Sequence, residues 1–467
     1  MPGKLIVRGA YRSDKPGADG LKAAFDKFLQ QIERDVIAGT FGDFDASIFP
    51  NKAAFEVFDK QTNEVSRAFS ELDAEGLENG RFQFRLELDS ALFAEPDYGL
   101  QRLVHTLASD LFERRVHDYS GKIAVSSIEF GGVKDAMVAA YRPVSYTRAD
   151  IRAAFALKEK RPLLAFSLKP RGCLSDDDYV HIATAAFDKG CSIVELDTRD
   201  LVIDQGARLA LFQRLTKLGL DLSKERICRF AANVSGPARI VGPTLEALAK
   251  MHIDHNPDTA WVVKVDGNLD GLSTIQAIRS GCYGLPKQPI ITCYPVLKYA
   301  LQSALGRNAF VEMLAMSGAD IIYPGQSPDF GFSNNRIEPE VVAAAQSHYQ
   351  KMADGDFPML SVAGGIFINS VHACLSVLGP DVAFFAGGGI ALSKKGIAEG
   401  AGNFAEAIEL SCQDLFDGKQ NKGLKDKLID LSRIYFKDSK IPADYELILP
   451  ASLKNVPLVA ESTNLKA

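Results

Sequence analysis

The sequence predicts an α/β protein, with a ferredoxin-like α+β N-terminal domain followed by a (β/α)8 TIM barrel and a C-terminal helical extension. Up to residue 130, strand-like runs and amphipathic helices follow the order β-α-β-β-α-β, which is the ferredoxin-like arrangement. Beyond residue 143, short continuous apolar runs recur between helix-length segments, as expected for parallel strands buried on both faces. We expect the domains to span residues 1–145, 146–413 and 414–467.

The N-terminal domain is predicted from alternation. The clearest strand is residues 81–88, where R-F-Q-F-R-L-E-L places polar and apolar side chains on opposite faces. The full set of expected elements is strands at 5–12, 54–58, 81–88 and 123–130, and helices at 21–37 and 99–115.

The barrel is predicted from eight apolar runs, at residues 163–168, 192–196, 227–234, 261–265, 290–294, 321–323, 359–362 and 382–386. Between the first two runs, Ser175 followed by three aspartates predicts a helix N-cap, and Lys189-Gly190 predicts the end of that helix. Eight such βα repeats make a TIM barrel, whose chemistry lies at the C-terminal ends of its strands.

Composition narrows the class of protein. No run of about 18 apolar residues and no leader are seen, so we expect a cytoplasmic protein without a membrane span. The 53 Lys+Arg and 59 Asp+Glu form no long like-charged block, which argues against nucleic acid or membrane partners and leaves a small-molecule ligand. The seven cysteines form no C-x-x-C pair and the seven histidines are scattered, so neither residue type predicts a metal site.

A lysine follows the first barrel strand. Pro170 ends the strand after Lys169, so this amine should project at the rim, where desolvation could let it lose a proton near neutral pH. The alternative interpretation is a solvated surface lysine.

Two acids end the second barrel strand. Glu195 and Asp197 are two residues apart, so both carboxylates face one volume. An otherwise apolar strand would not bury two acids without a cation. That cation is either Mg²⁺ or one of the side chains Arg199, Arg229 and Lys264, and both interpretations stay open.

Glycines follow the last two strands. Gly364-Gly365 comes after the seventh and Gly387-Gly388-Gly389 after the eighth, where TIM barrels commonly bind phosphate through backbone N–H groups. A purely steric role is the alternative.

At these residues the chain resembles the RuBisCO large subunit, and more closely the form IV RuBisCO-like proteins, which share its fold but do not fix CO₂. Residues 161–175, RPLLAFSLKPRGCLS, are similar to that family's R-P-L-L-G-C-T-I-K-P-K-L-G-L-S. Counting 26 residues from Lys169 reaches Glu195, where the family's metal motif K-D-D-E begins. Further similarities are residues 316–320 to M-S-G-G-D, 387–402 to G-G-G-T-L-G-H-P-W-G-N-A-P-G-A, 38–41 to T-G-T-W, and 110–112 to the segment with an active-site asparagine.

The departures from that family bear on activity. The family's lysine that reacts with CO₂ is replaced by Glu195, one metal carboxylate by Thr198, and the lysine that polarises CO₂ by Phe330. The resemblance therefore implies no carboxylation, and Mg²⁺ held by Glu195 and Asp197 without a carbamylated lysine.

The resemblance also bears on substrate and assembly. Tyr294-Pro295, Tyr323 and Ala363 replace residues that would bind a second phosphate, which implies one phosphate and a different group near Lys298. It further implies a homodimer or dimer assembly, in which Thr40 and Asp110 would serve the partner's site.

The leading hypothesis is an enzyme that acts on a phosphorylated sugar or sugar acid through an enol or enolate, by enolisation, isomerisation or decarboxylation. Lys169, Arg171 and Asp110 would be catalytic. One alternative is a catalytically inactive sugar-phosphate-binding barrel with a sensing or interaction role. Another is a metal-free aldolase type in which Lys169 forms a Schiff base.

Overall fold

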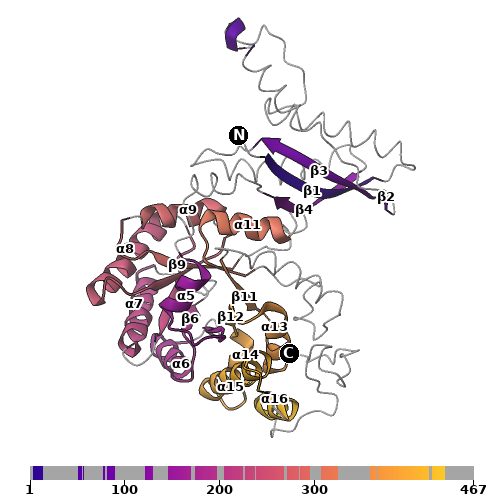
Figure 1. Ribbon diagram of the computed structural model, residues 1–467. Coiled ribbons are helices and arrows are strands. Elements are labelled where there is room, and N and C mark those ends of the chain that lie inside the picture. The colour runs from indigo at the N-terminus through magenta and orange to yellow at the C-terminus, as the bar shows by residue number, and fades with distance from the viewer. Residues whose placement is uncertain are drawn as a thin grey trace. The chain divides into compact units, whose positions relative to one another are not determined.

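The computed structural model describes residues 4–13, 51–54, 56, 77–78, 81–89, 121–129, 146–169, 174–196, 205–223, 227–236, 238–267, 271–282, 284–294, 307–323, 358–364, 366–419 and 423–436. The chain divides into two compact units (Figure 1): unit 1 is Met1–Pro143 with Leu297–Gly318, and unit 2 is Val144–Val296 with Ala319–Ala467. The domain boundaries predicted at residues 145 and 413 stay predictions. None of the helices in the described ranges is long and apolar enough to cross a membrane.

Unit 1 contains an antiparallel sheet with the strand order β2-β3-β1-β4. Its strands are β1 (Lys4–Ser13), β2 (Leu77–Glu78), β3 (Arg81–Asp89) and β4 (Gly121–Glu129), and α11 (Arg307–Ser317) contacts β4. The first and last strands of this unit, β1 and β4, are neighbours in the sheet. This is the order expected when the two β-α-β halves of a ferredoxin-like chain interleave. The helices predicted at 21–37 and 99–115 lie outside the described residues.

One predicted strand is wrong. Residues 52–54 and 56 are helical, although the sequence analysis expected a strand at 54–58. The Asn51 side chain accepts a hydrogen bond from the Ala54 N–H at 2.9 Å, and Lys52 forms an i,i+4 ion pair with Glu56 at 3.3 Å. A capping asparagine and an ion pair at helical spacing favour a helix over the weak alternation of that segment.

Unit 2 contains a closed barrel of eight parallel strands, which confirms the predicted fold class. All eight predicted strands are present: β5 (Leu163–Ser167), β6 (Ile193–Leu196), β7 (Arg229–Asn233), β8 (Trp261–Val265), β9 (Pro289–Cys293), β10 (Ile321–Ile322), β11 (Met359–Ala363) and β12 (Val382–Phe385). Their side chains are almost all buried, because the interior fills one face and helices cover the other.

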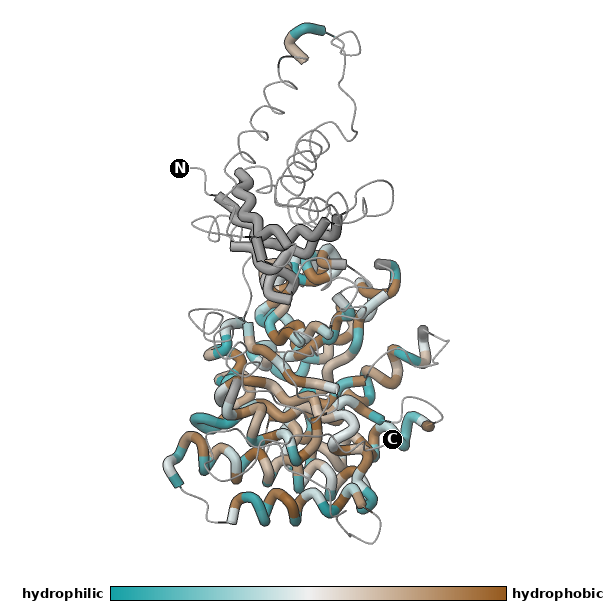
Figure 2. Tube along the Cα trace, turned by 90° about the vertical axis from the view of Figure 1, so that its right-hand side faces the viewer, coloured by the Kyte–Doolittle hydropathy of each residue, from teal (hydrophilic) through white to brown (hydrophobic). Residues whose placement is uncertain are grey.

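Helices surround the strands in Figure 1. They are α5 (Arg148–Ala154), α6 (Asp176–Asp188), α7 (Gln205–Leu222), α8 (Ala238–His255), α9 (Gly271–Gly281), α13 (Ile368–Leu378), α14 (Gly387–Ala391), α15 (Ile397–Leu415) and α16 (Leu424–Ser432), with the 3-10 turn η8 (Arg433–Tyr435). In Figure 2 the strands at the centre of unit 2 are mostly brown or pale, whereas the surrounding helices alternate between teal and brown. The helices therefore turn an apolar face to the barrel and a polar face outward.

The predicted cap of α6 is present as a capping box. Ser175 Oγ accepts a hydrogen bond from the Asp178 N–H at 3.2 Å, and Asp178 Oδ2 accepts one from the Ser175 N–H at 2.9 Å. The helix ends at Lys189-Gly190, where Gly190 has a φ of 109°, a value that favours glycine.

The N-terminal end of the barrel is closed by a buried ion pair between Arg279 and Asp320. The Asp320 carboxylate also accepts hydrogen bonds from the Ile291 N–H at 2.7 Å and the Tyr146 N–H at 3.3 Å. Asp320 ends the M-S-G-A-D segment that the resemblance singled out. Here that aspartate ties three segments together at the start of β10.

The C-terminal helical extension packs back onto the barrel. Asn403 of α15 donates a hydrogen bond to the Leu431 carbonyl of α16 at 3.0 Å, and the Tyr435 hydroxyl donates one to the Gly389 carbonyl of α14 at 2.6 Å. The extension thus holds the short helix that follows the eighth strand.

Candidate active site at the barrel mouth

Polar side chains form a layer inside the barrel near the C-terminal ends of its strands. Below them the interior is apolar and includes Leu163, Ala165, Ile193, Ala231, Val262 and Ile290. Strand pairing places Ser167 of β5 opposite Glu195 of β6, and Lys264 of β8 opposite Thr292 of β9. Glu195 and Lys264 lie on alternate strands, from which each interior layer of a TIM barrel is built.

Glu195 and Lys264 form a buried ion pair. Lys264 Nζ lies 2.9 Å from Glu195 Oε1, and the residues are 2% and 4% exposed. Ser167 Oγ donates a hydrogen bond to the same carboxylate oxygen at 2.5 Å. The sequence analysis left open which cation neutralises Glu195, and among the described residues that cation is Lys264.

Arg229 lies at the opposite, N-terminal end of the barrel strands. It begins β7, and its guanidinium donates hydrogen bonds to the Cys228 carbonyl at 2.7 Å and to Ser223 Oγ at 2.5 Å. Burial lowers its pKa to about 10. Arg229 therefore binds main-chain and hydroxyl oxygens near the strand's start and has no part at the mouth.

Two tyrosines lie over the ion pair. Lys264 Nζ is 5.5 Å from the centre of the Tyr294 ring, which is a cation–π distance. Tyr294 stacks on Tyr323 with ring centres 4.7 Å apart and planes 3° apart, and the Tyr323 hydroxyl donates to the Ala363 carbonyl at 3.1 Å. The sequence analysis considered both tyrosines only as replacements, and missed that they pair.

A narrow cavity, partly open to solvent, lies beside this layer. The residues that line it are Glu195, Thr292, Cys293, Tyr294, Ile321, Tyr323, Ser361, Ala363 and Phe385. Burial raises the pKa of the Cys293 thiol to about 12, so this thiol is neutral at physiological pH. Glu195 is the one carboxylate among these lining residues.

Lys169 lies against the glycine segment that follows β12. A Cβ added to Gly387 would be 3.5 Å from Lys169 Cε and 3.5 Å from Ser167 Cβ. A side chain on Gly387 would thus crowd Lys169 and Ser167. The structure brings together the predicted catalytic lysine and the predicted phosphate segment, which are more than 200 positions apart in the chain.

The three glycines after β12 form the start of the helix α14 and have different surroundings. A Cβ on Gly388 would meet nothing nearer than 3.8 Å, whereas a Cβ on Gly389 would lie 2.3 Å from the Ile366 carbonyl oxygen. Gly364, after β11, has a φ of 68°, which favours glycine. Gly389 therefore has no space for a side chain, and Gly364, Gly387, Gly388 and Gly389 stay candidates for phosphate binding through their backbone N–H groups.

Several predicted site residues lie outside the described residues, namely Thr40, Asp110, Arg171, Asp197, Lys298 and Gly365. Ser167 was not singled out, although a serine at the end of an apolar strand, two residues before Lys169, is a signal that could have found it.

The donors that the described residues place around Glu195 do not fit Mg²⁺. Magnesium prefers near-octahedral oxygen ligands, usually one or two carboxylates with several waters. Oε1 of Glu195 is shared by an ammonium and a hydroxyl, and a divalent ion there would be repelled by Lys264. Within the described ranges no three His, Cys, Asp or Glu side chains come together to hold a metal ion.

Comparison with known proteins gives structural matches alone. No protein-family model and no curated protein sequence matches the chain. The octameric RuBisCO of Pyrococcus horikoshii, in complex with sulfate, has a TM-score of 0.69 at 16% identity, covering 92% of this chain and 93% of that one.

Two further structures are similar. The dimeric archaeal RuBisCO of Hyperthermus butylicus has a TM-score of 0.69 at 15% identity, covering 93% of this chain and 97% of that one. A rubisco-like protein (MtnW) of Alicyclobacillus acidocaldarius has a TM-score of 0.66 at 14% identity, covering 92% and 99%. The chain therefore has the fold that RuBisCO shares with the rubisco-like proteins.

Proposed function

We propose that this chain is a non-carboxylating, form IV type rubisco-like enzyme that acts on a phosphorylated sugar or sugar acid through an enol or enolate. One observation carries the proposal: Lys169 lies against Gly387, at the barrel end where TIM barrels carry out their chemistry. A proton-transfer group beside a candidate phosphate segment suits a small phosphorylated substrate.

The roles follow from the chemistry of each group. The Lys169 amine would take a proton from the carbon next to the substrate carbonyl, and Arg171 would bind the developing oxyanion. Asp110, with Thr40, would complete the site of a partner subunit. Backbone N–H groups near Gly364-Gly365 and Gly387-Gly388-Gly389 would bind the phosphate, and Lys298 would contact the other end of the substrate.

Carboxylation is not part of the proposal. A carbamate forms on an amine, and Glu195 offers a carboxylate in its place. Lys264, the neighbouring amine, is held in an ion pair with Glu195. We expect no labelled CO₂ to enter phosphoglycerate when the protein is incubated with ribulose bisphosphate, and incorporation above a blank without enzyme would refute this.

The reaction is tested by exchange of substrate hydrogen with solvent. A panel of ketose phosphates, aldose phosphates and sugar-acid phosphates is incubated with the full chain in D₂O and followed by proton NMR. We expect deuterium next to the carbonyl of at least one compound. In Lys169→Met, exchange should fall by about 10² to 10⁴, with binding within roughly tenfold of wild type.

The exposed lysine Lys189 provides a control. Lys189→Met also removes an ammonium, but on the surface after α6, and should leave exchange unchanged. If Lys169→Met keeps near wild-type exchange, the lysine is not the proton-transfer group. If borohydride with substrate traps a covalent adduct on Lys169, the Schiff-base alternative replaces the proposal.

A second candidate function is a sugar-phosphate-binding barrel without catalysis. It is favoured by the Glu195–Lys264 pair, because a carboxylate fully neutralised inside the barrel has little to offer a substrate. A phosphorylated compound that raises the melting temperature but undergoes no exchange would support this function.

We also propose a homodimer or an assembly of dimers. The similar RuBisCO structures include a dimer and an octamer, and the resemblance implies sites shared between subunits. Light scattering should give at least twice the 50.7 kDa chain mass, and a fully active monomer would contradict the shared site.

A further inference from the structure

We infer that the ammonium of Lys264 takes the place of the divalent metal ion that the resemblance implies on Glu195. In this interpretation Glu195 is the counter-ion of a built-in cation and does not ligate a metal. The inference concerns the site of the proposed function and rests on it only for what that cation would do in a reaction.

Burial requires the pairing. The side chains of Lys264 and Glu195 are 3% and 6% exposed, and an isolated charge at such depth is strongly destabilising. The 2.9 Å separation of Nζ and Oε1 gives each charge a direct partner. The requirement for a cation beside Glu195 is met by the chain itself.

The surroundings hold the ammonium in place. Glu195 Oε1 is fixed by Ser167 Oγ, and the face of Tyr294 lies over Lys264 Nζ. Tyr294 is in turn stacked on Tyr323, whose hydroxyl is anchored on a main-chain carbonyl. Aromatic faces attract an ammonium but offer Mg²⁺ none of the oxygen ligands it prefers.

The residues that line the cavity beside the pair also argue against a metal ion on Glu195. Its described lining has one carboxylate, that of Glu195, with Thr292 and Ser361 as hydroxyl donors and a neutral thiol. A metal ion bound there would lie beside the Lys264 ammonium, which would repel it. Under the proposed function, the enol-forming reaction would therefore need no divalent ion on Glu195.

The test measures ion binding, so it succeeds or fails separately from the proposed reaction. Mn²⁺ serves as the probe, because its free and bound forms are distinguished by electron paramagnetic resonance. The full chain is titrated as wild type, Glu195→Gln, Lys264→Met and the double variant, with Lys189→Met as the surface-lysine control.

We expect wild type and Lys189→Met to show no Glu195-dependent Mn²⁺ site up to about 1 mM, a range that covers weak protein sites for divalent ions. Lys264→Met leaves the carboxylate without its counter-ion and should bind Mn²⁺ at least about tenfold more tightly, with a matching rise in melting temperature. The double variant should lose that gain.

Two results would overturn the inference. One is a wild-type Mn²⁺ site that Glu195→Gln weakens by about tenfold or more, as expected of a lost ligand. The other is a folded Lys264→Met variant that gains no Mn²⁺ binding, because Lys264 would then not be what excludes the ion. If Lys264→Met does not fold, the comparison of wild type with Glu195→Gln decides alone.

Discussion

Replacing Gly389 with alanine should damage the barrel, although alanine is the better helix former. Gly389 lies in α14, and a Cβ there would be 2.3 Å from the Ile366 carbonyl oxygen and 3.0 Å from Phe404 Cε2. Ordinary contact needs about 3.4 Å or more, so a backbone carbonyl would have to move by about 1 Å. Tyr435 restrains the same residue through its hydrogen bond to the Gly389 carbonyl.

The magnitude follows from overpacking. Inserting one methyl group into a packed core costs about 1–3 kcal/mol, and here the obstructing atom is backbone, so we expect about 3 kcal/mol. The gain in helix propensity of up to about 1 kcal/mol does not offset it. For a unit of about 300 residues, 1 kcal/mol shifts the melting temperature by about 1–2 °C, so about 3 kcal/mol should lower it by roughly 3–6 °C.

The assay compares Gly389→Ala with Gly388→Ala by thermal and urea unfolding. Gly388 is the matched control, because it is the preceding residue of the same helix and has space for a Cβ. Gly388→Ala should unfold within about 2 °C of wild type. If Gly389→Ala is equally stable, the steric role assigned to this glycine is wrong.

Three further outcomes are expected. Gly388→Asp should fold, since a Cβ there has space, but should weaken binding of inorganic phosphate at least about tenfold by calorimetry, because it brings a negative charge to the candidate phosphate segment; unchanged binding would remove Gly388 from the site. Burial lowers the pKa of His252, which stacks on Trp261, to about 3, so the unfolded chain binds the proton first as pH falls below about 6.5. This group should therefore lower the free energy of unfolding by about 2 kcal/mol between pH 7.5 and pH 5, and in His252→Phe the free energy measured by urea unfolding should fall less over that pH range by this amount. Arg161 holds the pKa values of Glu409 and Asp417 below their usual range, so stability from this cluster is present above the ordinary carboxyl pKa and is lost as pH falls through the lowered values; Arg161→Met should melt at lower temperature at pH 7, and the difference from wild type should shrink at pH 3.

The strands of the barrel could be predicted because each depends on its own residues. A run such as Val382–Phe385 is apolar on both faces wherever it lies in the fold, and it forms β12. The strand predicted at 54–58 was wrong for a local reason too, because the cap by Asn51 and the Lys52–Glu56 ion pair favour a helix more than the alternation there favours a strand.

The site was harder to predict because its contacts join distant segments. Lys264 and Glu195 are 69 positions apart, and only the alternate-strand geometry of a closed barrel distinguishes Lys264 from the other candidate cations. Gly389 could not be separated from Gly388 by sequence, because the obstructing atom belongs to Ile366 on another segment. That Lys169 lies near the glycines did follow from the fold, since all of them come at strand C-terminal ends.

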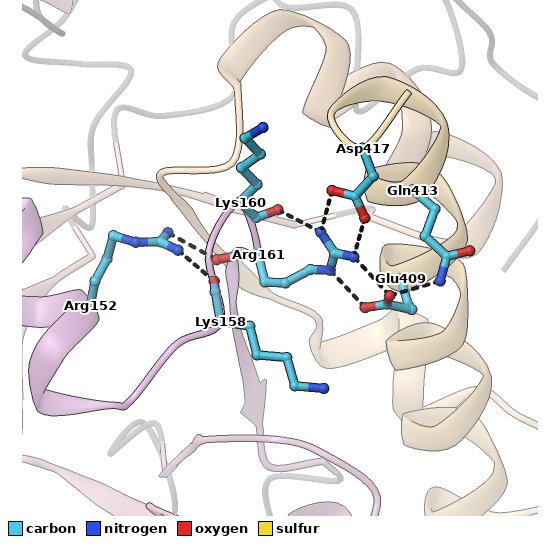
Figure 3. Close-up of polar contacts among 7 residues, drawn as sticks. All are labelled: Arg152, Lys158, Lys160, Arg161, Glu409, Gln413 and Asp417. Carbon is cyan, nitrogen blue, oxygen red and sulfur yellow. Dashed lines mark hydrogen bonds and ion pairs between the residues drawn. The ribbon is translucent and has the colours of Figure 1, made fainter. Parts of the chain in front are cut away.

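Arg161, just before β5, joins the two ends of the barrel's chain (Figure 3). Its guanidinium binds Glu409 at 2.7 Å and Asp417 at 2.7 Å, while Arg152 donates to the Arg161 carbonyl at 3.0 Å. Gln413 further fixes Glu409 with a hydrogen bond at 2.9 Å. The first strand is thus tied to the last barrel helix by contacts between residues 248 and 256 positions apart.

Contacts of such sequence separation form late, because a long loop must close before they can stabilise the chain. During synthesis the Arg161 cluster cannot form until residue 417 has left the ribosome, so a nascent chain that ends before α15 lacks these ties between the first strand and the last barrel helix. Interactions made after the rate-limiting step act mainly on unfolding. The Arg161 cluster should therefore set how long a folded barrel lasts, with little influence on how fast it forms.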